Sequence, residues 1–337
     1  MPTTIATRLL NGFDDPRLGA QRWNKLLRAG DTDAVNLTWE WQRSWWQSFA
    51  KGRLLLVAVE VDDEIIAIAP LFTDGGMIYN LCPEDRLDFI GDIGDTDVLI
   101  ALLETARNAV PDFAGFTFYF VPDCSRTPGR LRVAAAELHL SCHDGDVLPS
   151  PYIDLRRKRD AALACTRKKS LLRHENAFRR EGVLDVIHAR HAAEILPHLD
   201  AFFDQHIRRR AATTSPSLFV SERQRDYYRR LTSELSDTGW LRFTRISFNG
   251  RPIAFHHGLC YGRRYLFGIP SFEIELCHKS PGEVLLRQLM LAAIEEDAEK
   301  FDFGIGDERY KYRFATDVVQ LKTISMYPTG ASQASGA

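Results

Sequence analysis

Three apolar segments of strand length follow one another in the second half of the chain, each separated from the next by a pair of residues typical of a hairpin turn. The segments are 241–248, 253–261 and 264–269, and the turn pairs are Asn249-Gly250 and Gly262-Arg263. Turns of this kind join antiparallel neighbours, so the pattern predicts a three-stranded meander. A helix from Pro281 to Lys300 and a short strand over 301–304 come next, and the whole order predicts an α+β unit.

The first half of the chain also alternates between strand and helix patterns. Two apolar runs, 53–61 and 64–72, are joined by Asp62-Asp63 and are expected to form a hairpin, and helices are expected over 95–110 and 128–140. A length of 337 residues suits two domains of about 150 residues each. We therefore expect an α+β protein with two domains, each a mixed, mostly antiparallel sheet flanked by helices. The expected boundaries are 1–155 for the first domain, 156–182 for a basic linking helix, 183–328 for the second domain and 329–337 for a disordered tail.

The bulk composition favours a folded protein of the cytoplasm. The formal net charge is only −2, so no strong overall field draws the chain onto nucleic acid or anionic lipid. The six cysteines form no C-x-x-C pair, which favours free thiols in a reducing compartment, and no metal site is expected. No apolar run approaches the ~20 residues that a membrane span needs. We expect no membrane span.

The segment that begins the helix after the meander carries the strongest signal for ligand binding. Ser280 is a good N-cap, Pro281 suits the first helical position, and Glu283 three residues after the serine completes a capping box. The first N–H groups of such a helix can hold a phosphate, and Gly282 has no side chain to keep a ligand away from the backbone. Lys279 stands just before the helix. An ordinary helix start without a ligand remains the alternative, because the Glu283 carboxylate could occupy the same N–H groups.

In this context the sequence resembles a known family. The motif S-P-G-x-x-L-L followed by F-D-F-G-x-G-D-E-x-Y-K-Y-R-F, here Ser280–Leu286 and Phe301–Phe314, resembles the CelD-like branch of the GNAT acyltransferase superfamily. That branch is associated with bacterial cellulose and exopolysaccharide gene clusters and is related to Fem-type peptidyl transferases. The resemblance covers residues 150–328 well and the first half of the chain loosely. The usual GNAT phosphate signature Q/R-x-x-G-x-G/A is absent, and the S-P-G turn occupies its place.

The resemblance implies tandem GNAT-like domains and acetyl-CoA or another acyl-CoA as the acyl donor. The helix start would hold the pyrophosphate, and the thioester would lie along the strand that precedes it. The residues that this implies for the donor site are Lys279, Ser280, Pro281, Gly282, Leu266, Phe267 and Gly268. A backbone N–H of the splayed strands would polarise the thioester carbonyl.

The loop after residue 306 supplies the side-chain types that acyl transfer to an amine requires. Asp307 or Glu308 is the candidate base or amine ligand, and Tyr310 is the candidate acid for the leaving thiolate. Lys311 and Arg313 are candidate contacts to an anion or a carbonyl, and Lys311 matches a lysine of Fem-type enzymes. A loop lysine is expected to bury little surface. The alternative is a solvated charged loop.

Two further features leave alternatives open. His256 and His257 are neighbours on a strand, so one of them could line the acceptor site, although a core histidine is equally consistent with the pattern. The basic segment 156–180 could contact CoA phosphates or an anionic acceptor, or it could be a solvated helix face.

The sequence therefore predicts an acyl-CoA-dependent N-acyltransferase that acts on an amine of a small molecule. By family association the acceptor would be an amino sugar or a cell-envelope or exopolysaccharide precursor. One alternative is a Fem-like transferase that uses aminoacyl-tRNA, the single case in which a nucleic acid would be a partner. The other is a GNAT module that binds a ligand without catalysis.

Overall fold

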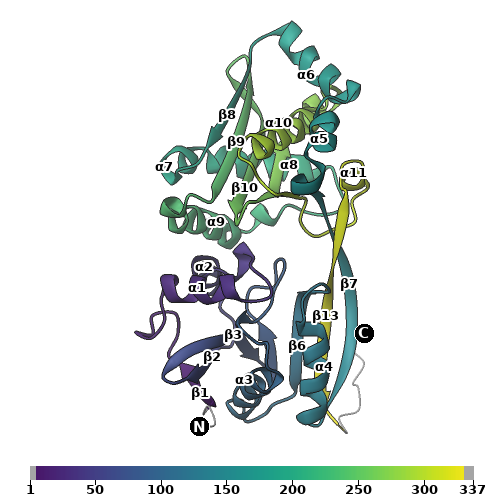
Figure 1. The fold of residues 1–337 in the computed structure, drawn as a ribbon. Helices are drawn as coiled ribbons and strands as arrows, with labels where there is room; N and C mark the ends of the chain where they lie inside the picture. The colour runs from purple at the N-terminus through teal and green to yellow at the C-terminus, as the bar shows by residue number, and fades with distance from the viewer. Residues whose placement is uncertain (1–4, 330–337) are drawn as a thin grey trace. The chain divides into compact units, whose positions relative to one another are not determined.

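The computed structural model describes residues 5–329, and the chain divides into two compact units (Figure 1). Unit 1 comprises the chain up to Pro149 together with the chain from Val319 onward, and unit 2 is Ser150–Val318. Two long strands, β7 (Leu140–Asp154) and β13 (Asp317–Pro328), contribute residues to both units. The tail expected to be disordered lies, from residue 330 on, outside the described residues.

Unit 1 is built on a sheet with the strand order β1-β2-β3-β4-β6-β13-β7, and its helices pack on that sheet. The β4–β6 pair is parallel, whereas β1–β2, β2–β3, β3–β4 and β6–β13 are antiparallel. The strands not yet bounded are β1 (Ile5–Leu10), β2 (Arg53–Val61), β3 (Glu64–Asp74), β4 (Met77–Asn80), β5 (Ile90–Gly91) and β6 (Gly115–Pro122). The helical segments are α1 (Ala20–Ala29), η1 (Val35–Leu37), α2 (Trp39–Phe49), α3 (Thr96–Asn108) and α4 (Thr127–Glu137).

Unit 2 contains the expected meander. The strand order is β7-β12-β11-β10-β9-β8, and β11–β12 is the parallel pair among antiparallel neighbours. Its strands are β8 (Leu184–Ala189), β9 (Leu241–Phe248), β10 (Arg251–Tyr261), β11 (Arg264–Phe272) and β12 (Lys300–Asp302). The helical segments are α5 (Leu155–Thr166), α6 (Lys169–Glu181), α7 (Ala192–Ile195), η2 (Leu196–His198), α8 (Leu199–Ala211), η3 (Leu218–Val220), α9 (Glu222–Glu234), η4 (Ser236–Thr238), η5 (Ile274–Lys279), α10 (Pro281–Glu295) and α11 (Arg309–Tyr312).

The expected hairpin turns form as the sequence indicates. Asn249 and Gly250 both have positive φ, as do Gly262 and Arg263, which is the backbone conformation of two-residue hairpin turns. Each unit is a mixed, mostly antiparallel sheet flanked by helices, so the expected α+β class is confirmed. No helix among residues 5–329 has the length and apolar composition needed to cross a membrane.

Helix α10 organises the core of unit 2. Leu285 and Leu289 are fully buried, and the helix packs against β10 and β11 as well as against α5 and α6. It is the crossover that the parallel pair β11–β12 requires, because parallel neighbours cannot be joined by a tight turn. The first turn of α10 therefore lies at the end of the sheet toward which both strands run.

The basic segment 156–180 differs from the linking helix that its charge suggested. It forms α5 and α6, and Leu171 and Phe178 of α6 are fully buried in the core of unit 2. Glu175 on the same face is buried too, and it accepts hydrogen bonds from Arg287 and Gln288 of α10. Leucine and phenylalanine seven residues apart give α6 a buried face, while the cations of the segment project from its other side. The compact unit therefore begins near residue 150 and includes both helices.

This placement makes the stability of unit 2 sensitive to α6. Phe178→Ala should lower the free energy of unfolding by about 3 kcal/mol, because it removes a fully buried ring and leaves a cavity. Chemical denaturation of the full chain measures the change. Arg180→Ala on the exposed side of the same helix is the matched control and should stay within about 0.5 kcal/mol of the parent protein. Equal stability of the two variants would contradict the packing described for α6.

Candidate functional site

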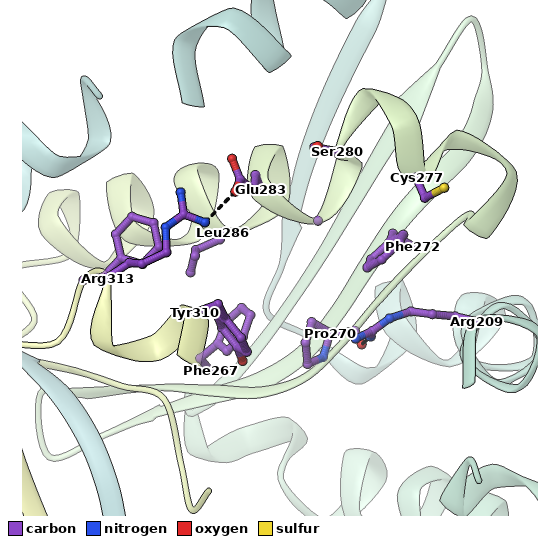
Figure 2. A pocket seen from close by; sticks show the side chains of 12 residues that line it. Arg209, Phe267, Pro270, Phe272, Cys277, Ser280, Glu283, Leu286, Tyr310 and Arg313 are labelled. Atoms are coloured by element: carbon purple, nitrogen blue, oxygen red, sulfur yellow. Dashed lines mark hydrogen bonds and ion pairs between the residues drawn. The ribbon is translucent and has the colours of Figure 1, made fainter. Parts of the chain in front are cut away.

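A cavity opens where β11 and β12 stop running side by side. The two strands are paired over residues 264–266 and 300–302, after which β12 ends while β11 continues to Phe272. The cavity has a volume of about 270 Å³ and lies beside the first turn of α10 (Figure 2). Its lining comes from β11, from η5 and α10, from α11 with the residues after it, and from one residue of α8. The lining residues are Arg209, Phe267, Pro270, Phe272, Cys277, Ser280, Gly282, Glu283, Leu286, Tyr310, Arg313 and Phe314.

Five of the residues singled out from the sequence come together in this cavity. They are Phe267, Ser280, Gly282, Tyr310 and Arg313. The helix start and the loop after residue 306 are therefore neighbours in space, although about thirty residues separate Glu283 from Arg313 in the chain. The remaining candidates do not line the cavity.

The start of α10 is not closed by the expected capping box. Ser280 adopts a left-handed conformation, with φ 56° and ψ 52°, and its side chain makes no capping hydrogen bond. Glu283 instead accepts a hydrogen bond of 2.8 Å from Nη1 of Arg313, and its other oxygen lies 3.5 Å from Nε2 of His174 on α6. The carboxylate thus turns away from the helix N–H groups, because the guanidinium of Arg313, the residue that follows α11, competes for it. The prediction of a capping box at this position is wrong.

Gly282 meets a protein group rather than open space. A Cβ at this position would lie 3.0 Å from Cδ1 of Phe272, so the absence of a side chain lets the phenylalanine ring approach the helix. From the sequence, the space left by the missing side chain of Gly282 was expected to admit a ligand. In the structure the ring of Phe272 fills part of that space.

Lys279 and Pro281 stand beside the cavity without lining it. The Lys279 ammonium forms an ion pair with Glu181 at the end of α6 and lies over the ring of Phe178. Pro281 is buried at the first position of α10. Because Lys279 is already paired, its contribution to an anion at the helix start would require that ion pair to exchange.

His256 lies in the core below the cavity. Its side chain is fully buried and stacks on Phe267, and Nε2 accepts a hydrogen bond of 3.2 Å from the N–H of Gly268. Burial, with a smaller contribution from the neighbouring His257, lowers the pKa of His256 to about 3, so the ring is neutral at ordinary pH. His256 therefore does not reach a substrate, and the Gly268 N–H is not free for a thioester carbonyl. Leu266 lies outside the lining and pairs with Leu259 on β10.

The acidic residues of the loop are engaged with their own neighbours. Asp307 accepts a hydrogen bond of 2.6 Å from the Tyr312 hydroxyl, and Glu308 lies 2.8 Å from Nζ of Lys311. Both side chains are exposed and outside the cavity lining. Neither is positioned to act on a group inside the cavity in this conformation.

Lys311 is buried, in contrast to the expectation for a loop lysine. Only 2% of its surface is exposed, and Nζ donates to the carbonyl oxygens of Gly304, Ile305 and Gly306 at 2.8–3.4 Å. The ammonium thus holds the chain that leaves β12 in a tight turn. The sequence could not reveal this role, because the carbonyl groups that the lysine collects belong to the backbone.

Tyr310 presents its hydroxyl to the cavity from α11. Burial, with a contribution from the Glu308 carboxylate, raises its pKa to about 12. The phenol is therefore protonated at neutral pH. Among the residues that the structure describes, no side chain or backbone group forms a hydrogen bond with this hydroxyl.

Arg209 and Cys277 line the cavity, although their positions in the sequence did not predict it. Arg209 lies in the last turn of α8, far from the motif in sequence. Its guanidinium donates a hydrogen bond of 2.6 Å to the carbonyl oxygen of Pro270 and lies 4.6 Å from the centre of the Phe272 ring. The run Arg208-Arg209-Arg210 was the available signal, but such a run at a helix end is typical of a solvated terminus.

The comparisons with known proteins agree with this geometry. The family model described as the acetyltransferase (GNAT) domain matches residues 166–312, which include β8–β12, α10 and the cavity lining except Arg313 and Phe314. Residues 166–312 form a GNAT domain. Among curated proteins, none matches the chain in sequence.

Solved structures extend the likeness beyond the GNAT domain. FemX superposes with a TM-score of 0.66 at 10% identity, covering 91% of this chain and 96% of FemX. A tandem GNAT protein from the clavulanic acid biosynthesis pathway gives 0.54 at 13% identity, covering 98% and 100%. A conserved protein of unknown function from Bacteroides thetaiotaomicron gives 0.62 at 13% identity, covering 92% and 98%. At these identities the likeness establishes the fold, which is the two-domain GNAT-like arrangement.

Within residues 5–329, no three histidine, cysteine, aspartate or glutamate side chains lie together in a group that could hold a metal ion. The polar groups that line the cavity are the phenol of Tyr310, the guanidinium groups of Arg209 and Arg313, the carboxylate of Glu283, the thiol of Cys277, the hydroxyl of Ser280 and the backbone at the start of α10.

Because Lys311 is buried, its substitution should destabilise the fold, whereas a solvated loop lysine could be replaced without loss of stability. Lys311→Ala should lower the free energy of unfolding by about 2 kcal/mol, because it removes a buried ammonium that donates to three carbonyl groups of the 304–306 turn. Thermal or chemical denaturation provides the readout. Arg309→Ala, an exposed residue of the same short helix, should leave stability nearly unchanged. A Lys311→Ala protein as stable as the parent would show that this ammonium is not a structural cation.

Proposed function

We propose that the GNAT domain transfers an acyl group from an acyl-CoA, most simply acetyl-CoA, to an amine of a small molecule. The observation that carries the proposal is the cavity at the point where β11 and β12 diverge, beside an uncapped helix start. In this proposal the arm of the donor enters between the diverging strands, and its pyrophosphate lies near Ser280 and Gly282, where helix N–H groups favour an anion.

The chemistry proposed for the site is direct transfer. The amine nitrogen attacks the thioester carbonyl carbon, a tetrahedral intermediate forms, the carbon–sulfur bond breaks, and the thiolate takes a proton. Tyr310 is the proposed proton donor, since it lines the cavity and its raised pKa keeps the phenol protonated at neutral pH. Glu283 carries the carboxylate of the cavity lining and is the proposed acceptor of the amine proton.

The acceptor is proposed as a small amine. The resemblance to the CelD-like branch suggests an amino sugar or another precursor of the cell envelope or of an exopolysaccharide, and acyl-CoA pools place the reaction in the cytoplasm. This part of the proposal rests on family association.

A Fem-like reaction with aminoacyl-tRNA is the second candidate, and a specific surface favours it. Lys169, Arg173 and Arg180 form an exposed stripe along α6, and none of the three has an ion-pair partner within the described chain. Such a stripe can attract a polyanion. The fold likeness to FemX over most of both chains is consistent with this candidate.

A donor titration separates the two candidates. Acetyl-CoA should raise the melting temperature of the full chain in a concentration-dependent way, because a ligand that binds the folded state stabilises it by mass action. Longer acyl-CoAs, free CoA and tRNA are tested in parallel. Stabilisation by tRNA alone, with affinity that falls steeply as salt increases, would replace acyl-CoA by aminoacyl-tRNA as the donor. Binding of acetyl-CoA without turnover on any amine would leave a binding module.

The proposed role of Tyr310 as proton donor can be tested by comparing Tyr310→Phe with Tyr312→Phe. Tyr310→Phe should lower kcat about 100-fold and leave the KM for acetyl-CoA nearly unchanged, because it removes a proton donor and keeps the ring. The pKa of about 12 means that the parent enzyme should lose no activity through tyrosine ionisation below about pH 11. Tyr312→Phe removes an exposed hydroxyl that bonds to Asp307 outside the cavity, and it should keep full activity. Equal rates for the two variants would exclude Tyr310 as the acid.

A further inference from the structure

The last turn of α8 carries three consecutive arginines, of which Arg209 lines the cavity, and they differ in their partners. Arg208 pairs with the buried carboxylate of Glu273 at 2.9 Å. Arg209 lines the cavity, where its contacts are the Pro270 carbonyl and the Phe272 ring. Arg210 is partly buried, and its Nε has no hydrogen-bond partner.

Neither Arg209 nor Arg210 has a carboxylate partner among residues 5–329. The carboxylates around them are already engaged: Glu273 with Arg208 and Arg251, Glu283 with Arg313, and Glu308 with Lys311. Burial, and then the charge of Arg210, lowers the pKa of Arg209, which expresses the cost of holding two like charges together away from water. Partly buried cations without counter-ions leave a site that an anion would complete.

We propose that Arg209 and Arg210 bind a carboxylate or phosphate group of the acceptor, so that the amine substrate of this protein is itself an anion. This inference rests on the function proposed above and narrows its substrate class. Guanidinium groups suit such a role because their N–H donors match the oxygens of both anions in pairs.

The position of the two arginines favours the acceptor over the phosphates of the donor. The ring of Phe272 stands between Arg209 and the start of α10, since Arg209 lies over its face and Gly282 meets its edge. Figure 2 shows Arg209 beside Pro270 and Phe272, with Ser280 beyond the ring. Both guanidinium groups also lie within electrostatic reach of the Tyr310 hydroxyl, whose pKa they lower. The anion site is thus on the side of the proposed proton donor.

The anion site can be tested without any acyl donor. Inorganic phosphate, at constant ionic strength against chloride, should raise the melting temperature of the parent protein by a few degrees. Arg209→Gln and Arg210→Gln should each abolish most of that rise, and either variant suffices if the other folds poorly. Arg28→Gln, at an exposed position in the last turn of α1, is the matched control and should keep the rise in full. An equal effect of phosphate on all four proteins would overturn the anion site.

Steady-state kinetics with acetyl-CoA and varied acceptors test whether the anionic group bound by the arginines belongs to the acceptor or to the donor. Matched pairs of amines serve as substrates, for example an amino acid with its amide, and glucosamine 6-phosphate with glucosamine. The anionic member of a productive pair should have a KM at least about tenfold lower than its neutral partner. Arg209→Gln should raise that KM about tenfold while the KM for acetyl-CoA changes less than about twofold, and Arg209→Lys should recover part of the loss.

The possible failures are distinguishable. If the substitutions raise the KM for acetyl-CoA and phosphate competes with the donor, the arginines hold CoA phosphates and the assignment to the acceptor is wrong. Equal use of anionic and neutral amines has the same consequence. If the parent protein binds no acyl-CoA but still binds phosphate through the arginines, the proposed acyl transfer fails and the anion site stands.

Discussion

The short parallel pairing of β11 with β12 is the constraint on which the site depends. Parallel neighbours need a crossover, and α10 supplies it with a buried face that packs on the sheet and on α5 and α6. The pairing extends over three residues of each strand, after which β11 continues alone. The space left by β12 is bordered by the first turn of α10 and by the chain that leaves β12, and this is where the cavity lies. The geometry of the site therefore follows from where one strand stops.

Local sequence patterns were sufficient for the framework of this site. Hairpin turns at Asn249-Gly250 and Gly262-Arg263 and the start of a helix at Pro281 depend on the conformational preferences of a few adjacent residues. The placement of Tyr310 and Arg313 beside Ser280 followed from the family motif. These features are set by short segments, so one sequence contains the information needed to predict them.

The errors have a common cause, which is competition from groups distant in sequence. Glu283 suits a capping box by every local rule, yet its carboxylate accepts a hydrogen bond from Arg313 instead. Lys311 suits a solvated loop, yet it gathers backbone carbonyl groups and is buried. The cations of the segment 156–180 concealed the apolar face of α6. In each case an ionisable side chain found its partner through the fold, and periodicity and propensity carry no information about such pairs.

Unit 1 consists of two segments of the chain separated by unit 2, and this affects the order in which the two units fold during synthesis. Strand β13 completes the sheet of unit 1 by pairing with β6, and Thr117 and Ser325 meet at 3.1 Å although 208 residues separate them. During synthesis all of unit 2 leaves the ribosome before β13 is available. Unit 2 can thus form its core while β6 has β4 as a neighbour but not yet β13, and the free edge of β6 stays open to incorrect pairing until β13 has been synthesised. Early folding of unit 2 shortens the effective loop between β6 and β13, which is a kinetic benefit of inserting one folding unit between two strands of the other.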